Sequence, residues 1–95
     1  MHSITLADFS DLIHHDFPVI THAGRIVMTL TAATPLPGGI PGGRQPFSLK
    51  FRGPVQPLLP QSMYSFEHPA HGTLDIFIVP VAADRDGLMY EAVFG

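Results

Sequence analysis

Hydrophobic and polar positions alternate along most of the chain, and this period of two predicts strands rather than helices. The alternating stretches are residues 17–22, 26–32, 47–53, 63–68, 73–79 and 88–94. In the third of them Phe47, Leu49 and Phe51 alternate with polar side chains, which indicates a strand with one buried face. The pattern therefore predicts about six strands, each with an inward apolar face.

The stretch 73–79 differs from the others because both of its faces are apolar. Ile76 and Ile78 share one face, and Phe77 lies on the other. A strand of this kind is expected to be central, or to be covered on its second face. The predicted helix is the obvious cover, and Pro80 is predicted to end the strand.

A helical period is present only in residues 5–15. Thr5 and Asp8 have the spacing of a capping box at its start, and Asp8 also favours the positive end of the helix dipole. The apolar side chains recur at three- and four-residue spacing on one stripe: Leu6, Phe9, Leu12 and Ile13.

Residues 34–46 are predicted to form a loop, because four prolines and four glycines in thirteen residues exclude a helix or an interior strand. The loop is either a contact arm or a plain spacer. The whole chain, 1–95, is predicted to be one domain of the mainly β (α+β) class. We expect about six antiparallel strands in a small barrel or roll, with one N-terminal helix that plugs an end or covers a face.

Charged residues make up only 14% of the chain, compared with about 25% in typical soluble domains. Such a surface favours a chain that is partly covered by another, as a homo-oligomer or with a protein partner. The alternative is that the Gly/Pro loops simply displace charged residues. The five basic residues are scattered and the net charge is −3, so nucleic-acid binding is not expected.

The sequence contains no cysteine, which excludes disulfides and thiolate chemistry and fits a cytoplasmic location. No apolar run approaches the ~18 residues of a membrane span, and no signal peptide is predicted. No cofactor and no catalytic residue is predicted.

The sharpest candidate for chemistry is the segment Glu67-His68-Pro69-Ala70-His71, because two imidazoles and a carboxylate can ligate zinc. The metal candidates are therefore His68, His71 and Glu67. Against a metal site, the usual helical pair is spaced by four, whereas here a proline lies between the histidines. This spacing is more typical of a hairpin turn with exposed imidazoles. A carboxylate pair of Glu67 and Glu91 would require their strands to be neighbours.

Four charged side chains are candidates for contact with a partner. Arg52, Glu67 and Glu91 point outward from predicted strands, and Arg44 lies in the Gly/Pro loop. The simpler interpretation of the strand residues is cross-strand ion pairs on the solvent face. The functional interpretation is a polar patch that docks a partner.

Several segments resemble a small bacterial family known only as a domain of unknown function. They are F-x-L-x-F-x-G-P at 47–54, L-P-Q-x-x-Y-x-x-x-H-P-x-x-G at 59–72, F-x-V-P-V at 77–81, Y-E-A-V-F at 90–94 and L-A-D-F at 6–9. The chain departs from the family pattern at Ser62 and at His71, and a replaceable His71 counts against metal binding. The resemblance brings no catalytic residues. It implies a structural or accessory role, such as a subunit of a phage-tail-like or other bacterial assembly.

Three functional hypotheses follow. The first is a non-enzymatic structural or accessory interaction protein. The second is a small β-barrel that binds a small apolar ligand among its aromatic rings: Tyr64, Phe66, Tyr90 and Phe94. The third is a metal-dependent enzyme that uses His68 and His71.

Overall fold

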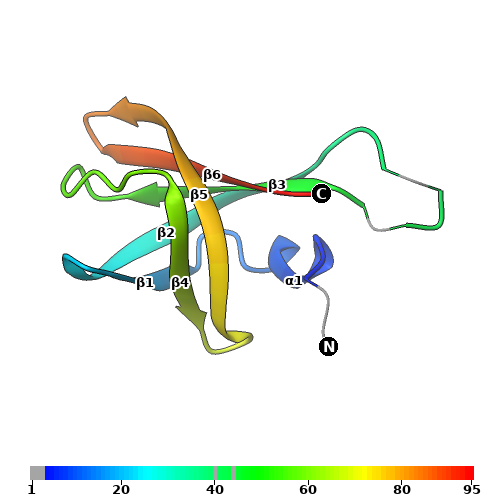
Figure 1. Ribbon diagram of the computed structural model, residues 1–95, viewed down its shortest axis with the longest axis horizontal. Helices are drawn as coiled ribbons and strands as arrows, with labels where there is room; N and C mark the ends of the chain where they lie inside the picture. The colour runs from blue at the N-terminus through cyan, green and yellow to red at the C-terminus, as the bar shows by residue number, and fades with distance from the viewer. Residues whose placement is uncertain (1–3, 40, 44) are drawn as a thin grey trace.

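Six antiparallel strands close into a barrel in the computed structural model, which describes residues 4–39, 41–43 and 45–95 (Figure 1). The elements are α1 (Ala7–Ser10), β1 (Asp16–Thr21), β2 (Gly24–Pro35), β3 (Phe47–Gly53), β4 (Ser62–His68), β5 (Gly72–Asp84) and β6 (Gly87–Phe94). The strand order around the barrel is β1-β2-β3-β6-β5-β4. The predicted class, mainly β with six antiparallel strands and one helix, is confirmed.

The inward faces of the strands fill the barrel with close-packed side chains. The Phe51 ring meets the Phe17 ring edge-on at a centroid distance of 5.5 Å and lies 4.8 Å from the Phe66 ring. Interior side chains that are at most 1% exposed include Phe17, Val19, Met28, Leu30, Phe47, Leu49, Phe51, Phe66, Ile76, Ile78 and Tyr90. The alternation in the sequence thus places one apolar face of each strand in a shared core.

Two tyrosine hydroxyls fasten the segment before β4 to this core. The Leu59 N–H donates to the Tyr90 hydroxyl at 3.0 Å, and the Tyr64 hydroxyl donates to the Pro60 carbonyl at 2.7 Å. Burial, followed by the neighbouring Tyr90, raises the pKa of Tyr64. Both hydroxyls are therefore satisfied by backbone groups, as buried polar groups require.

The helix is shorter than the predicted 5–15 and spans only Ala7–Ser10. The Asp8 carboxylate accepts the Thr5 N–H at 2.8 Å, so half of the predicted capping box forms, while the Thr5 hydroxyl does not cap the helix. The helix ends because the chain turns to join β2. The His14 N–H donates to the Leu30 carbonyl at 2.7 Å, and His14 adopts a left-handed φ of +74°.

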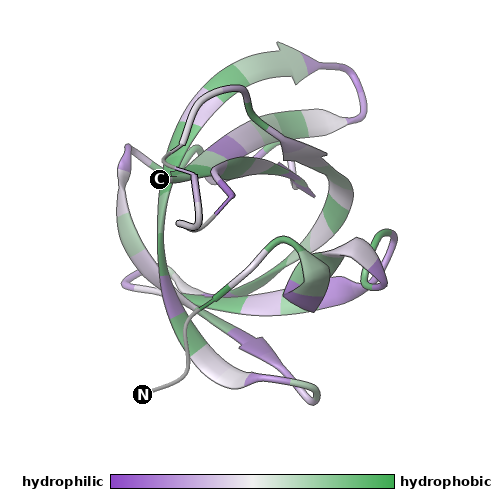
Figure 2. Cartoon of the chain, turned by 90° about the vertical axis from the view of Figure 1, so that its right-hand side faces the viewer, coloured by the Kyte–Doolittle hydropathy of each residue, from purple (hydrophilic) through white to green (hydrophobic). Residues whose placement is uncertain are grey.

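The helix plugs one mouth of the barrel, as the end-on view of Figure 2 shows. The Phe9 side chain is fully buried, and its ring lies 6.3–6.5 Å from the rings of Phe17, Phe47 and Phe94. The Phe47 and Phe94 rings stack at 4.7 Å. The sequence predicts a helix that either plugs an end of the barrel or covers a face, and the structure shows the first arrangement.

The second face of β5 is therefore not covered by the helix, contrary to the sequence-based expectation. The Phe77 side chain remains 50% exposed. The strand also continues past its predicted end at 79, through Pro80 to Asp84. Proline is tolerated there because a β-bulge interrupts the pairing with β6 between Pro80 and Ala82. In addition, β4 begins only opposite Ile78, so Pro80 lies beyond the pairing with β4.

The predicted Gly/Pro loop projects from the barrel beside α1 (Figure 1). It is shorter than 34–46, because β2 continues to Pro35, opposite Phe47. The Leu36 N–H donates to the Pro46 carbonyl at 2.9 Å and closes the base of the loop. Across the described part of the chain, no helix is long and apolar enough to cross a membrane.

Candidate functional site

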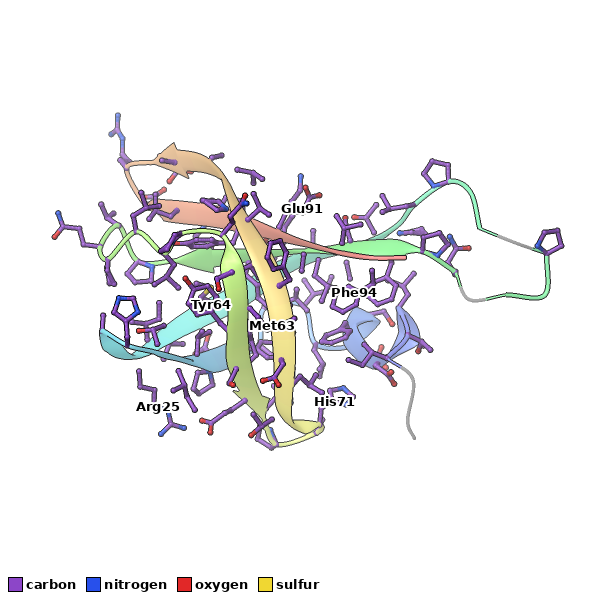
Figure 3. The ribbon with its side chains drawn as sticks, in the orientation of Figure 1. Arg25, Met63, Tyr64, His71, Glu91 and Phe94 are labelled. Carbon is purple, nitrogen blue, oxygen red and sulfur yellow. The ribbon has the colours of Figure 1, made fainter. Side chains whose placement is uncertain are left out.

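The outer surface of the β4–β5 hairpin carries an exposed apolar pair. Met63 on β4 and Phe77 on β5 are register partners, and they are 57% and 50% exposed. Met63 lies on the part of the hairpin that faces the viewer in Figure 3. Farther along β5, Val81 is 48% exposed. We call Met63, Phe77 and Val81 the outer β5 face.

Polar groups flank the outer β5 face on its β4 side and on its β6 side. On one side the Ser65 hydroxyl donates to the Asp75 carboxylate at 2.9 Å. On the other side Glu91 of β6 is opposite Val79, and Lys50 of β3 is opposite Glu91. An apolar centre with a polar rim is the composition expected of a protein contact surface.

The four predicted partner-binding residues do not form one patch. Glu67 and Glu91 lie on strands that flank β5 rather than pair with each other, which also separates them as a carboxylate pair. Arg52 lies opposite Met89 at the far end of β3 and β6. Arg44 lies outside the described residues. Of the three candidates that the structure describes, only Glu91 borders the outer β5 face.

Two of these candidates form cross-strand ion pairs. The Glu67 carboxylate binds the guanidinium of Arg25 from β2. The Arg52 guanidinium donates to both oxygens of Asp84, at 2.9 and 3.2 Å, and this hydrogen bond, followed by those from the backbone of the β5–β6 turn, lowers the pKa of Asp84. Pairs of this kind on a solvent face contribute little to stability, because water screens their charges.

Three histidines gather at the lower end of the β4–β5 hairpin, where Figure 3 labels His71. The ring of His68 stacks on that of His15 at a centroid distance of 5.3 Å, and the His15 Nδ1 and His68 Nε2 atoms are 3.1 Å apart. His71 Nε2 donates to the Asp8 carbonyl at 2.8 Å, and its ring lies 5.6 Å from that of Phe9. The hairpin turn is thus bound to the segment that enters the barrel.

Both predicted histidines are half-buried, and their nitrogens are already engaged. His68 Nδ1 accepts the Ala70 N–H at 3.0 Å. Burial lowers the pKa of His68, and the neighbouring His15 and His71 lower it further. Within the described residues no group of three or more His, Asp or Glu side chains is arranged to hold a metal ion.

Sequence reasoning did not find the contact between His15 and His68. His15 was placed on a helix next to His14, and 53 residues separate it from His68. The signal that could have suggested it is the closed barrel itself, because the strand order places β1 beside β4. His15 precedes β1 directly and His68 ends β4.

Two grooves lie on the surface of the barrel. The first, of about 490 Å³, is mainly apolar and lies between α1 and the base of the Gly/Pro loop; it is lined by Thr5, Leu6, Ala7, Ser10 and Gln45. The second, of about 350 Å³, lies beside the hairpin turn and is lined by Pro18, Arg25, Glu67, His68, Pro69, Gly72 and Thr73.

Comparison with known proteins identifies a family but no function. A family model described as "Domain of unknown function (DUF6916)" matches residues 4–94. No curated protein and no solved structure matches the chain. The resemblance to a domain of unknown function is therefore confirmed, and the match spans every strand of the barrel. The chain belongs to the DUF6916 family.

Proposed function

We propose that this chain is a non-enzymatic interaction protein whose outer β5 face docks on another protein, in the simplest case a second copy of itself. The observation that carries the proposal is the register pair of Met63 and Phe77, half-exposed at the centre of a sheet face. Aromatic and methionine side chains are enriched at the centres of protein interfaces. The low charge of the chain, 14%, supports the same interpretation.

Because side chains fill the interior of the barrel, we expect the function to reside on its outer surface. Three of the rings considered for an internal ligand, those of Tyr64, Phe66 and Tyr90, are at most 9% exposed and belong to the core. The hydroxyls of Tyr64 and Tyr90 bind backbone groups. An accessory place in a phage-tail-like or other bacterial assembly, in the cytoplasm, is the setting that we propose for this docking.

Replacing Phe77 with Glu is expected to weaken self-association about 30-fold or more, which is the effect of losing a central interface contact of about 2 kcal/mol. The measurement is sedimentation velocity over a range of protein concentrations. Val27→Glu is the matched control, because Val27 is 51% exposed on β2, a strand that does not pair with β4 or β5. It adds the same charge on a strand elsewhere, so the control should associate as the wild type does.

Thermal unfolding at protein concentrations too low for association separates an interface effect from a folding defect. Both positions are exposed, so both variants should melt alike under these conditions. If the wild type is monomeric at every concentration, self-docking is excluded. If Val27→Glu dissociates the protein as strongly as Phe77→Glu, the outer β5 face is not the interface.

A second candidate function, binding of a small apolar molecule, is favoured by the groove between α1 and the Gly/Pro loop. Its volume of about 490 Å³ lies in the range of ligand sites. The site differs from the one that the sequence suggested, because Leu6 and Ala7 line it rather than the aromatic rings of the barrel.

Ala7→Trp should fill this groove and reduce the fluorescence of bound anilinonaphthalene sulfonate several-fold. Ala7 is exposed on α1, so the fold should tolerate the larger side chain. Ala83→Trp, at an exposed position of β5 outside the groove, is the control. Equal dye binding by both variants would exclude the groove as the apolar site.

A further inference from the structure

The hydrogen bonds of His68 fix where its proton resides. Its Nδ1 accepts the Ala70 N–H at 3.0 Å, so this nitrogen carries no proton. A neutral imidazole then carries its proton on Nε2, which faces His15 Nδ1 at 3.1 Å. His15 Nδ1 must be the acceptor of that bond. Both rings are therefore neutral in this arrangement, because each contributes one unprotonated nitrogen.

We propose that His15 and His68 form a pH-operated latch, closed while both rings are neutral and opened when either ring gains a proton. A proton on His68 enters at Nδ1 and breaks the bond from Ala70. A proton on His15 enters at Nδ1 and makes this nitrogen a donor. Two N–H groups then face each other, and the hydrogen bond between the rings is lost. No protonated form keeps both hydrogen bonds.

The latch joins two segments that are distant in sequence. His15 directly precedes β1, and the turn before it is bound to β2 through His14 and Leu30. His68 is the last residue of β4, and Ala70 lies in the turn to β5. Opening the latch releases the last residue of β4 from the residue that precedes β1, while the hairpin turn stays bound through His71. The rings are also stacked, so two positive charges would repel each other across 5.3 Å.

The tether beside the latch is expected to remain at low pH. His71 donates from Nε2 to the Asp8 carbonyl, and a protonated imidazole can still donate this bond. The change is therefore confined to the pair of His15 and His68.

Other charged groups around the pair act in both directions. They are His71 from the hairpin turn, Asp8 from α1, Asp16 from β1, Arg25 from β2 and Glu67 from β4. The carboxylates promote opening because they favour a protonated ring, whereas Arg25 and a protonated His71 oppose it. All five groups have bonding partners of their own. Glu67 pairs with Arg25, and Asp16 accepts the Thr29 hydroxyl. The Asp8 carboxylate accepts the Thr5 N–H, and His71 donates to the Asp8 carbonyl.

The sign of the pH effect follows from the lowered pKa of His68. The unfolded chain takes up a proton on this residue near its ordinary value of about 6.5, whereas the folded chain takes it up only at lower pH. The contribution of the latch to stability is therefore complete above pH ~6.5 and is lost as the pH falls from there through the folded-state pKa of His68.

The test is a histidine titration by NMR on the wild-type protein, with ¹⁵N shifts that distinguish the two tautomers. His68 is expected to be the Nε2–H tautomer at pH 7.5, and to titrate below the ordinary histidine pKa of about 6.5. An Nδ1–H tautomer, or a midpoint at or above this ordinary value, would overturn the proposal.

Two variants test the coupling between the rings. His68→Asn keeps an acceptor for the Ala70 N–H in an Asx turn but cannot titrate. It should remove most of the loss in melting temperature between pH 7.5 and 5. The control His22→Asn, at an exposed position of the β1–β2 turn, should leave that loss unchanged. His15→Phe keeps a stacked ring without a second charge, so the midpoint of His68 should move up towards the ordinary histidine value. An unchanged midpoint in His15→Phe would refute the coupling.

Discussion

Phe9→Ala is expected to lower the free energy of unfolding by about 3–5 kcal/mol, the usual cost of truncating a buried phenylalanine. Phe9 is the fully buried side chain of the plug, and its ring contacts three phenylalanine rings that come from β1, β3 and β6. Because α1 has only four residues, it has no stability of its own and depends on this packing. The measurement is urea and thermal unfolding, with a fall in Tm of about 12 °C or more.

Phe77→Ala is the matched control for this substitution. It removes the same atoms from a ring that is 50% exposed, so it should cost less than about 1 kcal/mol when both variants are measured at concentrations too low for association. If the two variants unfold at the same urea concentration, the helix does not contribute to the core. Loss of the plug should also shift the His71 resonances, since the Phe9 ring lies 5.6 Å from that of His71.

The barrel could be predicted because each strand has one buried face. A strand that slips by one residue moves every side chain to the opposite face, so burial forces the sequence into a strict period of two. Phe47, Leu49 and Phe51 show this most plainly, and β3 has the predicted bounds. The strand order and the closure of the barrel depend on contacts between distant segments, which no local pattern records.

The errors have local physical causes. The helical period of 5–15 is real, since Phe9 and Leu12 are both buried, but tertiary hydrogen bonds to Leu30 override it after Ser10. Pro80 was taken as a strand end, whereas a bulge accommodates it. Burial of both faces of β5 was inferred from hydropathy alone. Hydropathy cannot distinguish a face covered by the same chain from one that is left exposed.

The candidate site was predictable only in part. The outward position of Met63 follows from the alternation of β4, and that of Phe77 from the alternation of β5, but their pairing depends on the register of the hairpin. The partner of His68 lies 53 residues away. The three candidates predicted on strands, Arg52, Glu67 and Glu91, lie on different strands. An outward position in the alternation identifies a face of a strand but does not show which residues of different strands come together.

Gly87→Ala is expected to lower the free energy of unfolding by about 2–4 kcal/mol through a combination of backbone strain and steric overlap. Gly87 has a φ of +152°, and a Cβ atom there would lie 2.3 Å from the Gly53 carbonyl oxygen. Its N–H also donates to the Asp84 carboxylate at 3.1 Å, so the residue cannot move without losing the β5–β6 turn. Thermal unfolding should show the loss, with Tm lower by about 8 °C or more.

Gly72→Ala separates the two causes. Gly72 opens β5 with a φ of +69°, and a Cβ atom there would meet no heavy atom within 4 Å. This variant carries the backbone strain alone, about 1–2 kcal/mol. If Gly87→Ala is as stable as Gly72→Ala, then β3 must move away from the new methyl group. Because Gly53 is paired with Leu88, the ladder between β3 and β6 would have to shift with it. The difference between the two variants therefore sets an upper limit on the steric cost at Gly87, because a φ of +152° is itself more strained for alanine than a φ of +69°.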